Sequence, residues 1–168
     1  FEEIEALAPV DILRRAELEV KTVGVGGKTI TGSHGITVTA DIEEKDVTTD
    51  DMKLMILPGG MPGTTHLRRD ERVCDVVREF AATKHVAAIC AAPFILGELD
   101  LLEGRHATCF PGFEKSFPEG AYTGEKVTQD GNIITASGMA QSLPFALELL
   151  RTLAGDKAVE KVAEGIQL

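Results

Sequence analysis

Hydrophobic and polar positions along this chain follow two patterns: short runs that are apolar throughout, and longer segments with helical spacing of apolar residues. The runs at 54–57 and 86–89 are typical of parallel strands buried on both faces. Helical spacing predicts helices at 2–16, 70–85, 92–102, 141–153 and 156–166. Further strands are predicted at 18–25, 36–40 and 106–110.

The order of these segments predicts an α/β fold in a single domain spanning 1–168. Strands that alternate with helices favour a parallel sheet with helices on both faces. Asp70 is expected to cap the helix that follows it, and Asp130-Gly131 is a hairpin turn between 127–128 and 133–135. The chain opens directly in a helix, without a lead-in strand, cap or initiator Met, so we expect the natural sequence to begin upstream of Phe1.

Composition and charge narrow the classes of function. The formal net charge is −10, which disfavours binding to nucleic acid or to anionic lipid. No apolar stretch reaches the length of a membrane span. The three cysteines include no Cys-x-x-Cys pair, which disfavours a disulfide framework or a zinc site and indicates a reducing, cytoplasmic compartment.

The candidate chemistry lies where two apolar runs end, because ligands of parallel α/β sheets bind beyond the carboxyl ends of the strands. Gly59-Gly60 and Cys90 occupy two such ends. Cys90 stands between a strand and a helix, as in a nucleophile elbow. We therefore expect a strained backbone at Cys90, with helix N-terminal amides that favour the thiolate. The N–H groups of Gly60 and Ala91 are placed to stabilise an oxyanion.

The other interpretation of Cys90 is a small apolar filler, which is what most free cysteines are. Packing explains Cys74, beside the inner-facing valines of a helix, and Cys109, late in a predicted strand. If Cys90 is the nucleophile, it should be more acidic than the other two, because only Cys90 has helix N-terminal amides beside it.

A thiolate nucleophile needs a proton partner, and two glutamates are candidates. None of the four histidines falls in the His-x-Glu arrangement of glutamine amidotransferase triads, and His85 is expected to end a helix. Glu3 and Glu5 lie on the first helix, and a glutamate that faces a closed site can hold a proton at neutral pH. The alternative for each is a solvated helix carboxylate.

Four motifs, in order over essentially the whole chain, resemble the ThiJ/PfpI superfamily. They are Phe1-Glu2-Glu3-Ile4-Glu5-Ala6, Pro9-Val10-Asp11-Ile12-Leu13-Arg14-Arg15-Ala16, Leu57-Pro58-Gly59-Gly60 and Ala87-Ala88-Ile89-Cys90-Ala91-Ala92-Pro93. Within the superfamily the chain is most similar to the bacterial ThiJ/YajL-like subgroup, which is related to the human DJ-1 protein. The resemblance implies a flavodoxin-like sandwich with a mostly parallel central sheet and a nucleophile elbow, usually as a homodimer.

The resemblance also implies roles for individual residues, with no metal or organic cofactor. Cys90 matches the nucleophile, and Glu5 matches a protonated glutamate that hydrogen-bonds to it. The backbone positions that line the anion pocket are Gly59, Gly60 and Ala91, and the pocket or dimer-edge positions are His34, Phe110 and Arg14.

Two departures from the family pattern bear on the reaction. Ala91 stands where proteolytic members have a histidine, which argues against a protease. Phe110 stands where the human-type protein has a pocket histidine. The pocket wall usually written Gly-Pro-Gly-Thr reads Gly138-Met139-Ala140-Gln141 here, which concerns the choice of substrate.

Two functions from different classes follow from the resemblance. The first is a cofactor-free glyoxalase or deglycase, in which the Cys90 thiolate attacks methylglyoxal-like α-oxoaldehydes or their adducts and Glu5 moves the proton. The second is a non-enzymatic protein of oxidative stress, either a chaperone or a sensor in which Cys90 is oxidised to a sulfinate held by Glu5.

Overall fold

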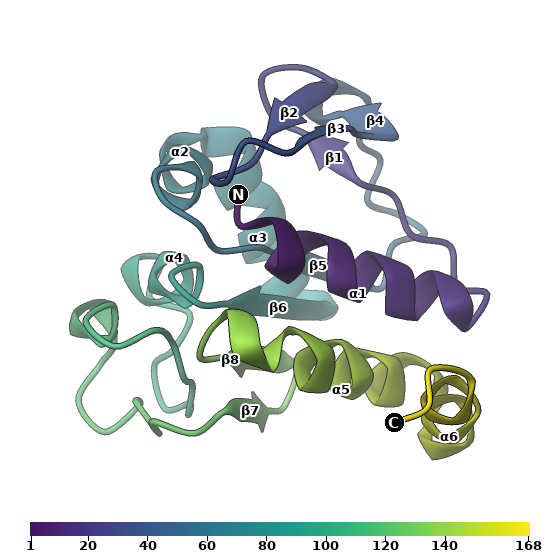
Figure 1. Ribbon diagram of the computed structural model, residues 1–168. Coiled ribbons are helices and arrows are strands. Elements are labelled where there is room, and N and C mark those ends of the chain that lie inside the picture. The colour runs from purple at the N-terminus through teal and green to yellow at the C-terminus, as the bar shows by residue number, and fades with distance from the viewer.

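The computed structural model describes residues 1–168 and contains a four-stranded central sheet (Figure 1). The strands follow one another in the order β5 (Leu54–Leu57), β6 (His85–Ile89), β8 (Ile133–Ala136) and β7 (Val127–Asp130). β5, β6 and β8 are parallel, and β7 runs antiparallel to β8. The two apolar runs are therefore confirmed as neighbouring parallel strands.

Helices cover both faces of this sheet, as the alternation of segments predicts. One face carries α1 (Glu3–Arg15), α5 (Ser142–Ala154) and α6 (Asp156–Gly165), and the other carries α2 (Gly63–Arg69), α3 (Glu71–Thr83) and α4 (Pro93–Glu98). In Figure 1, α1 and α5 run side by side across the near face. The flavodoxin-like α/β architecture is thus confirmed.

The central strand β6 shows why both faces must be covered. Val86 and Ala88 belong to the core under α3 and α4, whereas Ala87 and Ile89 belong to the core under α1 and α5. All four side chains are fully buried. A strand without a polar face is stable only between two apolar layers, which is why this run does not alternate with polar residues.

The segment between α1 and β5 forms two small sheets. β1 (Val23–Gly24) pairs in parallel with β4 (Ile42–Glu43), and β2 (Thr29–Thr31) pairs antiparallel with β3 (Thr37–Thr39). The predicted strand at 18–25 is therefore wrong over most of its length. Leu18 and Val20 pack against the core of α1 and α5, and no neighbouring strand bonds their backbone.

Other predicted elements differ from the structure at their ends. α4 ends at Glu98 rather than at 102, because Asp100 adopts a left-handed conformation with φ 59°. α3 ends at Thr83, so the prediction that His85 ends a helix is wrong: His85 opens β6. The short helix α2 went unpredicted because its first turn holds glycine and two threonines, which are poor helix formers.

The predicted strand at 106–110 is reduced to a single bridge between Ala107 and Tyr122. The segment is nonetheless buried at Ala107, Thr108 and Cys109. Its backbone groups are satisfied by loops and side chains, since the Thr108 N–H donates to Thr135 Oγ1 at 2.9 Å. Burial therefore accounts for the apolar character of this segment without a ladder.

The remaining predicted elements are confirmed to within a few residues. They are α1, α5, α6, β3 and the hairpin of β7 and β8. Three short 3₁₀ helices complete the chain: η1 (Glu44–Asp46), η2 (Glu114–Ser116) and η3 (Met139–Gln141). None of the helices is long and apolar enough to span a bilayer.

The cap of α3 gives a direct test of this architecture. The Asp70 carboxylate accepts a hydrogen bond from the Val73 N–H at 3.0 Å, so Asp70→Ala should lower the free energy of unfolding by about 1 kcal/mol. Urea unfolding followed by circular dichroism measures this. Asp75→Ala is the control: Asp75 lies on the same helix and pairs with exposed Arg78, so its loss should cost at most about 0.5 kcal/mol. Equal losses in the two variants would contradict the assignment.

Candidate active site

Cys90 lies on a strained turn at the carboxyl end of β6, as the sequence predicts. Its φ is 63°, a left-handed conformation that costs a residue with a side chain on the order of 1–3 kcal/mol. Two hydrogen bonds hold the turn: the Cys90 N–H donates to the Ala136 carbonyl at 2.8 Å, and the Cys90 carbonyl accepts from the Phe110 N–H at 2.8 Å. The expected elbow geometry is thus confirmed.

Gly59, in the loop after β5, lies against both the Glu5 side chain and the turn at Cys90. A Cβ on Gly59 would overlap the Glu5 carboxylate and would lie 2.7 Å from Cys90 Cβ and 2.9 Å from the Ile89 carbonyl oxygen. The missing side chain therefore makes room for the Glu5 carboxyl beside the cysteine. The same glycine also fixes the start of α1, because its carbonyl accepts from the Glu2 N–H at 2.9 Å.

Two backbone N–H groups, those of Gly60 and Ala91, act on the Cys90 thiol and lower its pKa. Gly60 has a φ of 91°, and a Cβ there would overlap the Phe1 and Glu2 backbone, so this position also requires glycine. The Gly60 carbonyl accepts from both the N–H and the hydroxyl of Thr64, each at 2.9 Å. Thr64 is fully buried, and no sequence signal pointed to its role.

Glu5 presents a buried carboxyl to this turn. The residue is 1% exposed, and its Oε2 has no hydrogen-bond partner in the protein. Burial raises the pKa of Glu5, and the neighbouring Cys90 thiol and Gly59 N–H oppose that rise only in part. A carboxyl in this position gains from holding a proton, because the protonated oxygen can donate to the sulfur.

The Cys90 thiol is not acidic while Glu5 is ionised. Burial is the first cause that raises the pKa of Cys90 to about 12, followed by the charge and hydrogen bond of Glu5; the Ala91 and Gly60 N–H groups lower the pKa by less. Burial also raises the pKa of Cys109 to about 12. The prediction that Cys90 is more acidic than Cys109 is therefore wrong for this state.

The two groups titrate as a pair, because the charge of Glu5 raises the pKa of Cys90 while the Cys90 thiol lowers the pKa of Glu5. A proton on Glu5 removes both the negative charge and the accepted hydrogen bond that hold the Cys90 proton in place. The proton shared by Glu5 and Cys90 thus decides whether the sulfur is a thiolate. The helix amides alone do not.

Glu3, the other acidic candidate, anchors the turn between β2 and β3 instead of facing the cysteine. Its carboxylate accepts from the His34 N–H at 2.7 Å and the Ile36 N–H at 3.4 Å, and lies 2.9 Å from His34 Nδ1. Burial opposes the charge of Glu3, but the hydrogen bonds from His34 and Ile36 outweigh it and lower the pKa to about 2. Ser33 adds two bonds to the Phe1 carbonyl, each of 2.8 Å.

Glu2, Glu3 and His34 also bring ligand atoms within 4.8 Å of one another. Their hydrogen bonds account for this cluster: Glu2 Oε2 accepts from the Glu5 N–H at 2.8 Å, and Glu3 is saturated by the turn. The function of the cluster is to hold the hairpin against the first turn of α1, next to Gly60.

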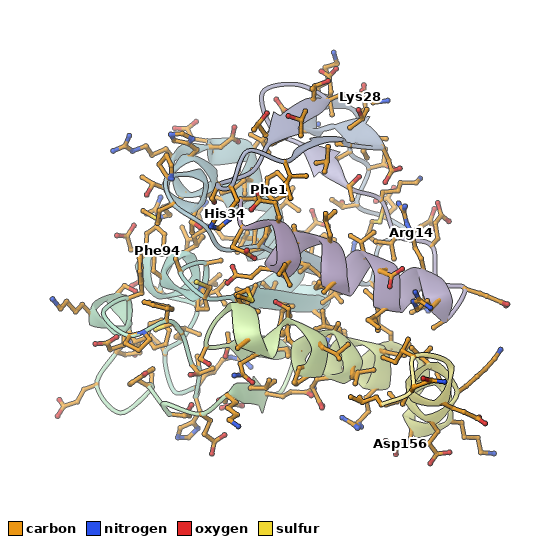
Figure 2. All side chains as sticks on the ribbon, viewed as in Figure 1. Phe1, Arg14, Lys28, His34, Phe94 and Asp156 are labelled. Carbon is orange, nitrogen blue, oxygen red and sulfur yellow. The ribbon has the colours of Figure 1, made fainter.

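The three pocket or dimer-edge positions fall in different places. His34 is exposed beside Glu3, and Phe110 is bonded through its backbone to Cys90. Arg14 lies toward the far end of α1 and pairs with Asp41 at 2.7 Å, away from Cys90, and its place at a dimer edge stays a prediction. Figure 2 shows Phe1 and His34 together at one end of α1 and Arg14 toward the other.

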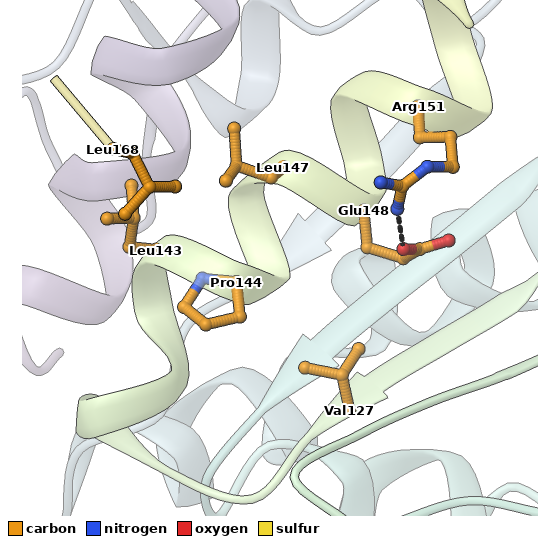
Figure 3. Close-up of a pocket in the computed structure, with 7 residues that line it drawn as sticks. All are labelled: Val127, Leu143, Pro144, Leu147, Glu148, Arg151 and Leu168. Carbon is orange, nitrogen blue, oxygen red and sulfur yellow. Dashed lines mark hydrogen bonds and ion pairs between the residues drawn. The ribbon is translucent and has the colours of Figure 1, made fainter. Parts of the chain in front are cut away.

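A cavity of about 370 Å³ lies elsewhere. It is lined by Val127, Leu143, Pro144, Leu147, Glu148, Arg151 and Leu168, between α5, β7 and the last residue (Figure 3). None of these residues is a nucleophile, and the only polar pair among them is the ion pair of Glu148 and Arg151. The chemistry therefore places the candidate site at Cys90 and not in this cavity.

Comparisons with known proteins agree with this fold. The family model described as the DJ-1/PfpI family matches residues 1–152. Protein dj-1beta of Drosophila melanogaster is 32% identical over 169 residues, covering 98% of this chain and 90% of the relative. A deglycase of Pyrococcus abyssi is 30% identical over 139 residues, covering 81% and 83%. The solved structure of oxidised Toxoplasma gondii DJ-1 has a TM-score of 0.94 at 31% identity, covering 99% of this chain and 92% of that one.

The Glu3 anchor predicts a specific dependence of stability on pH. Because the pKa of Glu3 falls from 4.5 to about 2 on folding, its contribution is present above pH 4.5 and is lost as the pH falls toward 2. Glu3→Gln should therefore be less stable than wild type at pH 5.5, with a difference that shrinks on acidification. Urea unfolding at a series of pH values measures it.

The urea measurements are confined to pH values below 6, because the pKa of His34 is raised on folding and its contribution to stability changes with pH in the opposite direction. The hydrogen bond and charge of Glu3 raise the pKa of His34, so its contribution is lost as the pH rises through that pKa. Glu19→Gln is the control, since Glu19 is 81% exposed. A Glu3→Gln difference that stays constant from pH 5.5 to pH 2 would rule out the anchor.

Proposed function

We propose that this chain, which belongs to the DJ-1/PfpI family, is a cysteine-dependent, cofactor-free glyoxalase or deglycase acting on methylglyoxal-like α-oxoaldehydes or their adducts. One observation carries the proposal: the buried, unpartnered Oε2 of Glu5 lies beside a cysteine on a strained turn whose sulfur faces two N–H groups. This combination suits a nucleophile with a proton carrier and an oxyanion site.

The first step uses the state in which Glu5 holds the shared proton. The Cys90 thiolate adds to the aldehyde carbon, and the C=O electron pair moves onto its oxygen. The N–H groups of Gly60 and Ala91 stabilise this oxyanion; each such donor contributes on the order of 10²–10³ in rate in enzymes where it has been removed. The Glu5 proton then passes to the oxygen, which gives a hemithioacetal and a Glu5 carboxylate.

The second step is an internal redox exchange between the two carbons of the substrate. The Glu5 carboxylate removes the proton from C1, which produces an enediolate, and returns that proton to C2. The hydroxyl proton on C1 moves to the oxygen of C2, so C1 is oxidised to a thioester and C2 is reduced to an alcohol. Burial raises the pKa of Glu5, which suits a group that must both release and take up a proton.

Hydrolysis completes the cycle and restores the starting charges. Water adds to the thioester carbonyl, the Cys90 thiolate leaves, and the second proton of the water returns to Glu5. The product from methylglyoxal is lactate. The deglycase of Pyrococcus abyssi supports this class of chemistry for a relative that is 30% identical.

The same geometry supports a second candidate, a redox sensor or chaperone of oxidative stress. Cys90 is partly exposed, whereas Cys74 and Cys109 are buried, so Cys90 is the thiol that an oxidant reaches. A protonated Glu5 and the two N–H groups would hold the oxygens of a Cys90 sulfinate. A solved relative is described as oxidised, which fits this candidate.

The setting in which the protein works is part of the proposal. Three free cysteines suit a reducing compartment such as the cytoplasm, and the family resemblance suggests a homodimer. Ala91 in place of a histidine next to the nucleophile argues against a protease. The bacterial subgroup of the family remains a prediction from the motifs.

The enzyme proposal is tested by lactate formation. Purified protein with methylglyoxal should release lactate. Cys90→Ser should release none above background, because Glu5 does not ionise a serine hydroxyl at neutral pH. Cys109→Ser is the matched control and should retain the activity, since Cys109 is buried outside the proposed mechanism. Lactate from Cys90→Ser at the wild-type rate would exclude Cys90 as the nucleophile.

Glu5→Gln separates the role of the proton from the shape of the side chain. Glutamine keeps the volume and can still donate a hydrogen bond, but it cannot exchange a proton at neutral pH. Lactate formation should fall by about 10²–10⁴, the usual contribution of general acid–base catalysis, while iodoacetamide labels Cys90 at nearly the wild-type rate.

The labelling rate also reports the charge of Glu5. If Glu5 were ionised in the resting protein, Glu5→Gln would lower the pKa of Cys90 and speed its alkylation. In a sensor, the variant would instead change how readily peroxide oxidises Cys90 and leave no lactate activity to lose. Wild-type turnover together with wild-type oxidation would reduce Glu5 to a structural carboxyl.

A further inference from the structure

Phe110 exposes an aromatic side chain beside the nucleophile, and neither the core nor the proposed proton transfer uses it. Its N–H donates to the Cys90 carbonyl at 2.8 Å, yet the residue is 49% exposed. Cys109, the residue before it, is fully buried. The backbone of Phe110 is therefore fixed against the elbow while its ring remains open to solvent.

The Phe110 ring lies at the end of β8, the strand next to β6. A Cβ on Gly138 would be 3.4 Å from Phe110 Cδ2, so the ring rests against the Gly138 backbone. Gly138 follows the strand whose last residue, Ala136, accepts the Cys90 N–H. The ring thus bridges two of the segments that meet at the nucleophile.

Two exposed methionines follow glycines of the same site. Met139, directly after Gly138, and Met61, directly after Gly60, are each 48% exposed. Phe110, Met139 and Met61 are called the apolar rim below. Phe110 is bonded through its N–H to the Cys90 carbonyl, Met139 follows the glycine that the Phe110 ring contacts, and Met61 follows the glycine whose N–H acts on the Cys90 thiol. Exposed apolar side chains gathered at a site of chemistry are typical of a binding surface.

The charged side chain that acts on the Cys90 thiol is a carboxylate. Glu5 raises the pKa of Cys90 through its charge and its hydrogen bond. Glu2 and Glu3 lie on the same turn of α1, and the whole chain has a formal net charge of −10. An anionic substrate would meet repulsion from these carboxylates.

We propose that the apolar rim selects a neutral substrate with an apolar substituent next to the reactive carbonyl, and that Phe110 is a specificity-determining residue. The proposal rests on the proposed function for the identity of that carbonyl, an α-oxoaldehyde. Aryl or alkyl α-oxoaldehydes suit the rim, whereas 4-carboxyphenylglyoxal, an α-oxoaldehyde that carries a carboxylate, does not.

The first experiment measures the preference of the apolar rim through covalent labelling of Cys90, which does not require turnover. Wild-type protein is treated with N-phenylmaleimide and, separately, with 3-maleimidopropionate, and the rate at Cys90 is read by mass spectrometry. The ratio of the two rates should exceed the ratio for glutathione by about tenfold, the lower range of what an apolar pocket discriminates. A ratio equal to that of glutathione would overturn the proposal.

Variants assign the effect to Phe110. Phe110→Ala should bring the ratio close to the glutathione value, and Phe110→Lys should shift it further toward the anionic reagent by supplying a cation. Val23→Ala is the control, because Val23 is 43% exposed on β1 and its loss should leave the ratio unchanged. A Phe110→Ala ratio like that of wild type would remove Phe110 from this role.

The second experiment measures turnover of phenylglyoxal, methylglyoxal and 4-carboxyphenylglyoxal, an α-oxoaldehyde that carries a carboxylate. Wild type should favour phenylglyoxal in kcat/KM, and Phe110→Ala should lose that preference through KM. Turnover of all three substrates at equal kcat/KM would overturn the proposal while leaving the proposed function standing. No hydroxy acid from any substrate, with the maleimide preference intact, would overturn the proposed function and retain the apolar rim.

Discussion

The carboxyl of Glu5 and the sulfur of Cys90 share a buried space beside Gly59, and most features of the site follow from that contact. A buried ionised carboxylate without partners is costly, and a thiolate next to it is costlier still, so the pair retains a proton. Gly59 must lack a side chain for the contact to exist at all. The chemistry of the site is therefore governed by the position of one proton.

Holding this contact requires several separate elements to be fixed relative to one another. The N–H of Cys90 is bonded to the end of β8, and its carbonyl is bonded to the loop at Phe110. The first turn of α1 is held by Gly59, by the Glu3 anchor and by Ser33. The strain at Cys90 is small beside the burial of two apolar clusters on both faces of the sheet, so the fold sustains the unfavourable backbone.

Glu3 and Glu5 of α1 have pKa values shifted in opposite directions because their surroundings differ. Glu3 and Glu5 are both buried, and they are two residues apart on one helix. Glu3 receives N–H groups from a turn, which lowers its pKa to about 2 and makes it a structural anion. Glu5 meets a thiol and a single opposing N–H, and burial raises its pKa. The number of donors that each carboxylate receives accounts for the difference.

Local pattern was enough to predict the elements that carry the site. The apolar runs at 54–57 and 86–89, the glycines after the first run and the cysteine after the second predicted two strand ends and an elbow, because these depend on residues adjacent in sequence. The motifs in turn predicted the family. What pattern could not supply were contacts between distant segments: Glu3 with the turn at His34, and the loop at Phe110 with Cys90. The sequence by itself determined which residue is strained and which helix follows it. Only the tertiary structure decided the protonation of that residue, because burial and the charge of Glu5 outweigh the two N–H groups that local reasoning had counted.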